Sequence, residues 1–261
     1  MSTEEEVLAA ADRNMVAAWR DLVAVSPDPG VVDDGDLVLL SSGVPVALFN
    51  PAFVTGAPSD PVAVVERCAD HYEPLGVPFA LYFRDEVAPG LAEACLARGL
   101  VEHWRPPLMV LDPIPPPTGP AAADLWIFQV DSTNVGDYAT TLAAGFGMPR
   151  ELAERMLGRS LLKVEGFTGF LGYMGGEPVA TSGLFVSEGV AGVYNVATVP
   201  GHRGQGIGAA LTWAAAWAGR DRGATFSILQ ASEAGEPVYR RMGYQTPTRY
   251  RQFVPAGSVS T

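Results

Sequence analysis

The chain has 261 residues, 48% of them hydrophobic, which is enough for one large domain or two small ones. Its 29 Asp and Glu residues outnumber 17 Lys and Arg, and the net charge of −12 argues against nucleic-acid binding, which depends on basic side chains. No apolar run reaches the roughly 18 residues of a membrane span. The start, MSTEEEVLAA, lacks the basic and apolar parts of a signal peptide, so we expect a cytoplasmic protein.

The first 112 residues predict a small α+β unit. Residues 4–24 have the periodicity of an amphipathic helix, and two strands at 37–42 and 44–50 are expected to pair around Gly43. The predicted elements that follow are a helix at 60–76, a strand at 78–85, a helix at 88–99 and a strand at 105–112.

A Pro-rich stretch follows. Four prolines between residues 113 and 117 and another at 120 oppose both helix and sheet ladder, and favour an extended linker. We therefore expect a linker at 113–123 between a domain at 1–112 and a second domain at 124–261.

The second domain is predicted to contain both element types in a mixed order. Its predicted strands are 124–132, 167–176, 177–189, 190–199, 226–232 and 248–254, and its predicted helices are 135–146, 148–158 and 206–222 with a short helix around Tyr239. Periodicity alone identifies only a mixed α+β fold.

The segment between strand 190–199 and helix 206–222 reads VPGHRGQGIGAAL. Gly204, Gly206 and Gly208 permit positive φ and leave room for an anion, and the following helix N-terminus offers free amides. Arg203 adds a forked, charged donor suited to phosphate. The string also fits the dinucleotide fingerprint G-x-G-x-x-A, ending at Ala209, or a plain turn. The late position in the chain leaves too few residues for a doubly wound nucleotide-binding fold.

The pattern Arg-x-x-Gly-x-Gly resembles the acyl-CoA pyrophosphate loop of the GNAT (Gcn5-related N-acetyltransferase) superfamily. A second segment, SEAGEPVYRRMGY at 232–244, is similar to the element of that family whose Tyr acts as a general acid. The resemblance implies a mixed, mostly antiparallel sheet flanked by helices. The helix-Gly-strand piece at 92–104 also resembles the end of such a domain. The first domain is therefore interpreted as a degenerate GNAT-like unit without the loop, and the alternative is an unrelated α+β cap.

The resemblance implies acetyl-CoA as co-substrate and assigns roles to particular residues. Tyr239 would protonate the leaving thiolate; its alternative is a packing tyrosine. Glu188 is the candidate general base, with Glu236 as another choice, although the position where many relatives place a Glu has none here. The residues expected to bind the cofactor are Val196, Ala197, Thr198, Val199, Arg203, Gly204, Gln205, Gly206, Ile207, Gly208, Ala209 and Ser232. Pantetheine would enter between strands 190–199 and 226–232, which would splay apart.

The sequence does not identify the acceptor of the acetyl group. A small-molecule primary amine, an amine on a protein or peptide, and a non-catalytic acyl-CoA-binding module are three alternatives. No membrane partner is expected, and a homodimer is left open. Cys68, Cys95 and the three scattered histidines have no metal-ligand spacing, so no metal is predicted.

Overall fold

The computed structural model describes residues 3–117 and 124–258, and the chain divides into two compact units. Unit 1 comprises Met1–Ala18 and Met109–Gln245, and unit 2 comprises Trp19–Leu108 and Thr246–Thr261. Each unit therefore uses two stretches of the chain, which differs from the predicted segments 1–112 and 124–261. Part of the predicted linker, residues 118–123, lies outside the described residues.

Unit 1 is built on a mixed sheet with the strand order β6-β11-β10-β9-β8-β7. Its strands are β6 (Pro107–Leu111), β7 (Leu125–Gln129), β8 (Phe167–Met174), β9 (Glu177–Ser187), β10 (Val190–Thr198) and β11 (Phe226–Gln230). Its helices are α4 (Val135–Phe146), α5 (Arg150–Leu157), α6 (Ile207–Asp221), α7 (Glu236–Arg241) and the first part of α1 (Glu4–Ala24). Neighbouring strands from β7 to β10 run antiparallel, and β10 runs parallel to β11.

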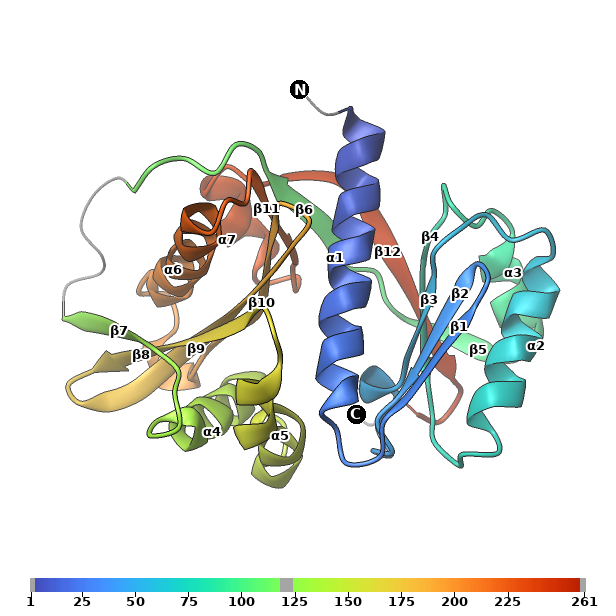
Figure 1. Ribbon diagram of the computed structural model, residues 1–261, viewed down its shortest axis with the longest axis horizontal. Coiled ribbons are helices and arrows are strands. Elements are labelled where there is room, and N and C mark those ends of the chain that lie inside the picture. The colour runs from blue at the N-terminus through green and yellow to red at the C-terminus, as the bar shows by residue number, and fades with distance from the viewer. Residues whose placement is uncertain (1–2, 118–123, 259–261) are drawn as a thin grey trace. The chain divides into compact units, whose positions relative to one another are not determined.

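The helices of unit 1 cover both faces of this sheet, with α6 on one face and α4 and α5 on the other (Figure 1). The inward face of α6 consists of small and aliphatic side chains. Leu211 packs with Val179 and Ala180 of β9, and Ala215 packs with Ala191 of β10. Such short side chains let the helix lie close to the strands, which fixes where its N-terminus meets the end of β10.

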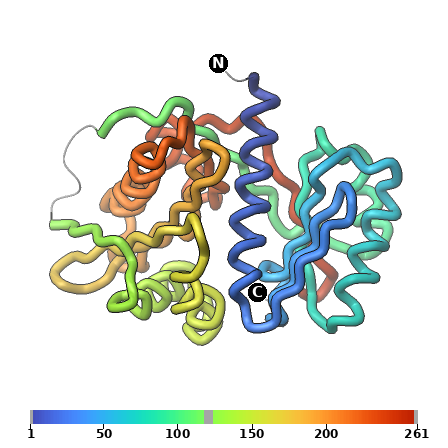
Figure 2. Tube along the Cα trace, in the orientation of Figure 1, coloured from blue at the N-terminus to red at the C-terminus, as the bar shows by residue number. Residues whose placement is uncertain are grey.

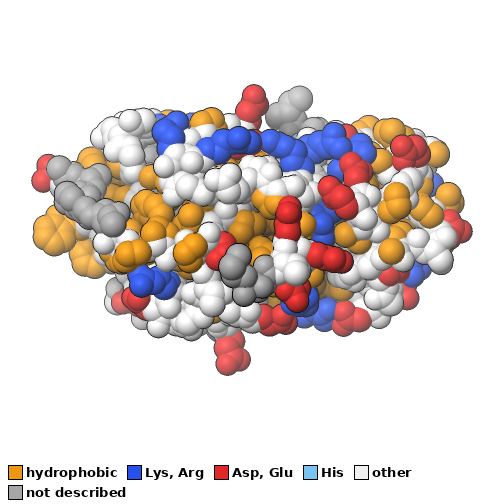
Figure 3. Space-filling model, turned by 90° about the horizontal axis from the view of Figure 1, so that it is seen from above, with side chains coloured by type: hydrophobic (Ala, Val, Ile, Leu, Met, Phe, Trp, Pro, Cys, Tyr) orange, Lys and Arg blue, Asp and Glu red, His pale blue; other side chains and the backbone are white. Residues whose placement is uncertain are grey.

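Strand β7 ends the sheet order of unit 1 and exposes aromatic side chains. Trp126 and Phe128 are 69% and 51% exposed, while Leu125, which points to the opposite face, is buried. Figure 3 shows hydrophobic side chains gathered at the left of the view. This alternation of buried and exposed residues follows the two-residue period of a strand.

Unit 2 has a sheet in the order β1-β2-β3-β4-β12, and β5 also pairs with β12. Its strands are β1 (Gly30–Asp34), β2 (Leu37–Ser41), β3 (Pro51–Val54), β4 (Ala80–Arg84), β5 (Leu100–Trp104) and β12 (Gln245–Pro255). Helices α2 (Pro61–Tyr72) and α3 (Leu91–Ala97) pack on it, and their buried side chains join those of the strands in one apolar cluster.

The predicted strand pair around Gly43 is wrong. The hairpin forms instead between β1 and β2, and it turns at Gly35, which has φ of +65°. Residues 42–50 form a loop with a short 3₁₀ segment, because the buried side chain of Asn50 holds that loop together. Its Nδ2 donates to the carbonyls of Val44 and Val46, and its Oδ1 accepts from the amide of Ser42.

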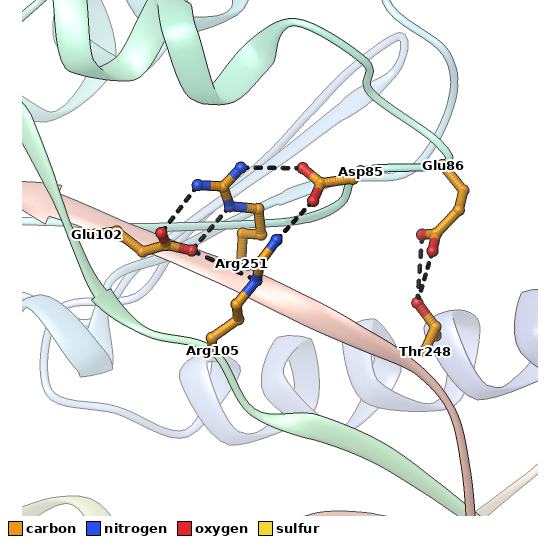
Figure 4. A network of polar contacts seen from close by, with 6 residues as sticks. All are labelled: Asp85, Glu86, Glu102, Arg105, Thr248 and Arg251. Carbon is orange, nitrogen blue, oxygen red and sulfur yellow. Dashed lines mark hydrogen bonds and ion pairs between the residues drawn. The ribbon is translucent and has the colours of Figure 1, made fainter.

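Strand β12 belongs to unit 2, although the sequence placed it with the second domain. It runs antiparallel to β4 from Tyr250 to Phe253, and its Phe253 is fully buried in the core of this unit. Arg251 donates from Nε and Nη2 to the two carboxylate oxygens of Glu102 and from Nη1 to Asp85, with donor–acceptor distances of 2.7, 2.8 and 3.2 Å (Figure 4). These charge-assisted bonds, together with the ladder, fasten the last strand to residues 149 and 166 positions earlier in the chain.

The predicted fold class is confirmed: each unit combines a mostly antiparallel sheet with helices. In the part of the chain that the structure describes, no helix is long and apolar enough to cross a membrane.

Candidate active site

The site begins where two parallel strands separate. Val190, Ala191 and Gly192 of β10 pair with Phe226, Ser227 and Ile228 of β11, and among the described residues the ladder goes no further. Strand β10 nevertheless continues to Thr198. The carboxyl half of β10 therefore has backbone groups that face away from β9 without a strand partner, which is the divergence that the sequence resemblance implied. An extended ligand can pair with such an edge.

A bulge in β10 lies within this separated half. Tyr194 pairs with Gly183 and Ala197 pairs with Thr181, so β10 has two residues where β9 has one. Asn195, in the bulge, has a φ of +54°, and its carbonyl accepts a hydrogen bond of 2.8 Å from the hydroxyl of Thr181. A bulge redirects the neighbouring backbone groups, and bulges are frequent next to active sites.

The Gly-rich loop connects β10 to α6, in the yellow-to-orange part of the trace (Figure 2). Gly204 and Gly206 have φ of +77° and +78°, and the space that a Cβ would enter at each is open. Within the described residues, the amides of 204–209 donate no hydrogen bond to another group of the protein, and the first helical bond of α6 is donated by Ala210. The loop therefore offers free donors at the positive end of a 15-residue helix, as an anion requires.

Arg203 is already engaged by backbone carbonyls. Its Nε donates to the carbonyl of Thr198 at 3.1 Å, and its Nη2 donates to the carbonyl of Gly145 at 2.7 Å. Gly145 lies in the last turn of α4, where carbonyls lack helical partners, so this guanidinium caps α4. Arg203 thus joins the end of β10 to the end of α4, and its remaining N–H groups are what it can direct to a phosphate.

Gly145 is a structural residue of the site that the sequence reading did not single out. A Cβ at this position would lie 2.7 Å from the Cβ of Ala197 and 3.3 Å from the amide nitrogen of Thr198. Only glycine allows α4 to approach the separated half of β10 so closely. A glycine inside a helix normally costs about 1 kcal/mol, so its presence in LAAGF was a detectable sign of close packing.

Tyr239 comes from α7 and is buried, at 8% exposure, in the cluster that includes Val193 of β10. Burial raises the pKa of Tyr239 to about 12, and a side-chain hydrogen bond with Thr212 of α6 opposes that rise. The hydroxyl of Thr212 itself donates to the carbonyl of Gly208 at 2.9 Å. Tyr239 is therefore protonated at neutral pH, and it is linked to the first turn of α6 through Thr212.

Ser232, expected to contact the cofactor, lies in the turn that leads into α7. Its hydroxyl oxygen accepts from the amide of Gly235 at 3.1 Å, which orders this turn. The ring of Tyr244 lies edge-on to that of Tyr239, with 6.0 Å between centroids, and its hydroxyl is hydrogen-bonded to Ser227. Tyr239 and the loop are thus brought to the same sheet end by α7 and α6.

Glu188 is not brought to this end. It occupies the turn between β9 and β10, with φ of +48°, and its carboxylate pairs with Nε of Arg13 at 2.7 Å. Thr198 lies ten positions further along the chain, most of them in β10, and at about 3.3 Å per residue this places the two residues roughly 30 Å apart. Glu236 lies on α7 and pairs with Arg240 at 2.7 Å. In the described residues no group of three or more His, Cys, Asp or Glu side chains could hold a metal ion.

Comparison with known proteins agrees with this geometry. Residues 165–246, which run from just before β8 to the start of β12, match the acetyltransferase (GNAT) domain family. Residues 165–246 of the chain thus carry a GNAT acetyltransferase domain. No curated protein sequence matches this chain significantly.

Solved structures resemble the chain over both units. A GCN5-related N-acetyltransferase from Kribbella flavida is 25% identical, with 95% of this chain and 96% of that one covered and a TM-score of 0.73. A GCN5-related N-acetyltransferase from Sphaerobacter thermophilus is 19% identical, with coverage of 85% and 81% and a TM-score of 0.63. A protein from Novosphingobium aromaticivorans, described as a GNAT-family acetyltransferase, is 16% identical, with coverage of 88% and 92% and a TM-score of 0.55. The last two show the fold.

Proposed function

We propose that unit 1 transfers an acetyl group from acetyl-CoA directly to a primary amine of a small molecule. The observation that carries this proposal is the combination of a separated β10 edge, free loop amides and a buried phenol at one end of the sheet. The open space at Gly204 and Gly206 supports binding of a pyrophosphate by the amides of residues 204–209.

In this proposal, backbone groups of Val196 to Val199 pair with the pantetheine arm as a neighbouring strand would. An amide beside the bulge donates to the thioester carbonyl and stabilises the oxyanion that develops on it. Loss of such a donor typically costs about 10²- to 10³-fold in rate. The amine nitrogen attacks the carbonyl carbon, the C–S bond breaks, and the departing sulfur takes a proton from Tyr239. The amine proton leaves to water, and water returns a proton to Tyr239.

Tyr239 is the proposed donor to the departing sulfur. A phenol with a pKa of about 12 keeps its proton at neutral pH, so it approaches the thiolate as an O–H donor. Glu188 has no place in this mechanism because its carboxylate lies at the other end of β10 and pairs with Arg13. No carboxylate is assigned as the base.

The net charge of −12 supports a cationic acceptor, because a negative field raises the local concentration of cations. The test is release of free thiol from acetyl-CoA in the presence of small primary amines and, separately, of lysine-containing peptides. Turnover with small amines is the expected result. Turnover with peptides alone would assign a protein acceptor, and binding without turnover would assign a non-catalytic acyl-CoA module.

A further inference from the structure

A buried asparagine of the first helix is bonded to the strands of the site. Asn14 of α1 is fully buried, and its Nδ2 donates to the hydroxyl of Ser187 at 2.8 Å and to the carbonyls of Phe185 and Val190 at 3.3 Å each. Its Oδ1 accepts from the hydroxyl of Tyr194 at 2.8 Å. All of these groups belong to unit 1, yet Asn14 lies far outside residues 165–246.

The partner Tyr194 occupies a decisive place in β10. It is the last residue paired with β9 before the bulge, and it precedes Asn195 with its positive φ. Gly192, where pairing with β11 ends, makes room for this contact: a Cβ there would lie 2.2 Å from Oδ1 of Asn14 and 2.5 Å from the ring of Tyr194. Burial raises the pKa of Tyr194 well above its usual value, so its hydroxyl stays a donor.

We propose that Asn14 is a positioning residue of the transferase: through Tyr194 it fixes the bulge of β10 that presents the carbonyl-polarising amide. This inference rests on the proposed function. The first helix then serves catalysis without touching substrate, and it is anchored a second time by the neighbouring ion pair between Arg13 and Glu188.

The physical reason is the sensitivity of acyl transfer to backbone placement. The bulge is held from the β9 side by the bond from Thr181 to the carbonyl of Asn195, and from the α1 side by the bond between Tyr194 and Asn14. Without the second bond the strand can shift at the bulge while the fold persists. A misplacement of about 1 Å can cost about 10²-fold in rate.

The test compares two hydroxyl deletions. Tyr194→Phe removes the donor to Asn14 and keeps the ring. Tyr72→Phe is the control, because Tyr72 of unit 2 is buried and its hydroxyl bonds to backbone groups of Leu40 and Pro51. We expect kcat to fall about tenfold in Tyr194→Phe, with KM for acetyl-CoA changed less than about twofold, while the control loses stability and keeps kcat. A kcat within about twofold of wild type in Tyr194→Phe would overturn the inference.

A double variant and an activity-independent readout complete the experiment. If Asn14→Leu and Tyr194→Phe both act by removing the hydrogen bond between Asn14 and Tyr194, the double variant should lose no more kcat than Asn14→Leu alone. Additive losses of kcat would show that the two residues act independently and would contradict the inference. Amide hydrogen exchange in ligand-free protein should quicken at residues 195–197 in Tyr194→Phe and not in the control, and unchanged exchange would overturn the inference even if wild type turned over no amine. Failure of the proposed function would instead appear as absent thiol release in wild type itself.

Discussion

Both units contain a parallel strand pair joined by a helix, and only one pair has the features of a ligand site. In unit 1, β10 and β11 share three paired positions, and β10 then extends six residues beyond them, from Val193 to Thr198. In unit 2, β3 and β4 also share three paired positions, but β3 ends one residue later, at Val54. The same supersecondary unit therefore leaves a long free strand edge in one case and hardly any in the other.

The N-terminus of the connecting helix is also open to a ligand in unit 1 and closed in unit 2. At α6 the loop amides are free, whereas at α2 the carboxylate of Asp60 accepts from the amides of Val62 and Ala63 at 2.9 and 3.3 Å. Pro61, the first residue of α2, has no N–H at all. A carboxylate of the protein thus occupies the place that an anionic ligand would need, so a parallel pair with a crossover helix does not by itself make an acyl-CoA site.

The largest effect is expected for Tyr239, the proposed proton donor of unit 1. Tyr239→Phe should lower kcat by about 10²-fold with little change in KM for acetyl-CoA, because binding groups persist and only the proton donor is lost. Steady-state thiol release measures both constants. Tyr244→Phe is the matched control, since that buried phenol in the same cluster bonds to Ser227. Equal kcat in Tyr239→Phe and wild type would return Tyr239 to a packing role.

The next effect concerns the loop itself. Gly206→Ala places a methyl group where the pyrophosphate should sit and should weaken acetyl-CoA binding at least about tenfold, or about 1.4 kcal/mol, by calorimetry. Gly223→Ala controls for backbone strain, because Gly223 has φ of +91°, lies in open space and follows α6 at its other end. Both variants should lose similar stability. An equal loss of affinity in both would remove the loop from the proposal.

Burial of Tyr239 also predicts a dependence of stability on pH. Its folded-state pKa is raised to about 12, while an unfolded tyrosine has about 10. The contribution of Tyr239 to the free energy of unfolding is fully present below a pH of about 10. It is lost as the pH rises toward 12, because only the unfolded state then gains free energy from ionisation of this phenol. Urea unfolding should show a fall in the free energy of unfolding over this window. The fall should be smaller in Tyr239→Phe, by on the order of 2 kcal/mol, and an identical fall would contradict the burial argument.

The smallest effect tests the closed N-terminus in unit 2. Asp60→Ala should lower the free energy of unfolding by about 1 kcal/mol, the usual contribution of a helix cap. It should not create a second binding site, because β3 still lacks a free edge. Calorimetry should therefore give one acetyl-CoA per chain in wild type and in the variant. A stoichiometry of two in either protein would show that the two strand pairs are more alike than their geometry indicates.

The parts of the site that the sequence predicted are local ones. The loop at 203–208 and the spacing to Tyr239 are carried by short segments whose glycines and helix starts fix their own geometry. The pairing of Asn14 with Tyr194 spans 180 residues and has no local signal. Arg203 was predicted as a phosphate ligand, but which carbonyls its guanidinium meets depends on where α4 ends.

For the fold as well, local signals could be recognised in the sequence and long-range pairings could not. The hairpin between β1 and β2 has a local signal, since DDGD contains an Asp-Gly turn signal, whereas the predicted hairpin had its turn at Gly43. The position of β12 was not detectable in this way. Its residues have strand character, yet the choice between partners in two sheets is made by tertiary contacts such as the burial of Phe253.

The late position of β12 in the chain affects how unit 2 folds during synthesis. At a ribosome adding about 5–20 residues per second, β4 and β5 emerge well before their shared neighbour, which ends only at Pro255. Until then the edges that receive β12 are unpaired, and unpaired edges invite association between nascent chains. Most of unit 2, residues 19–108, is therefore made before most of unit 1, yet its sheet is completed last, so late truncations during synthesis should harm unit 2.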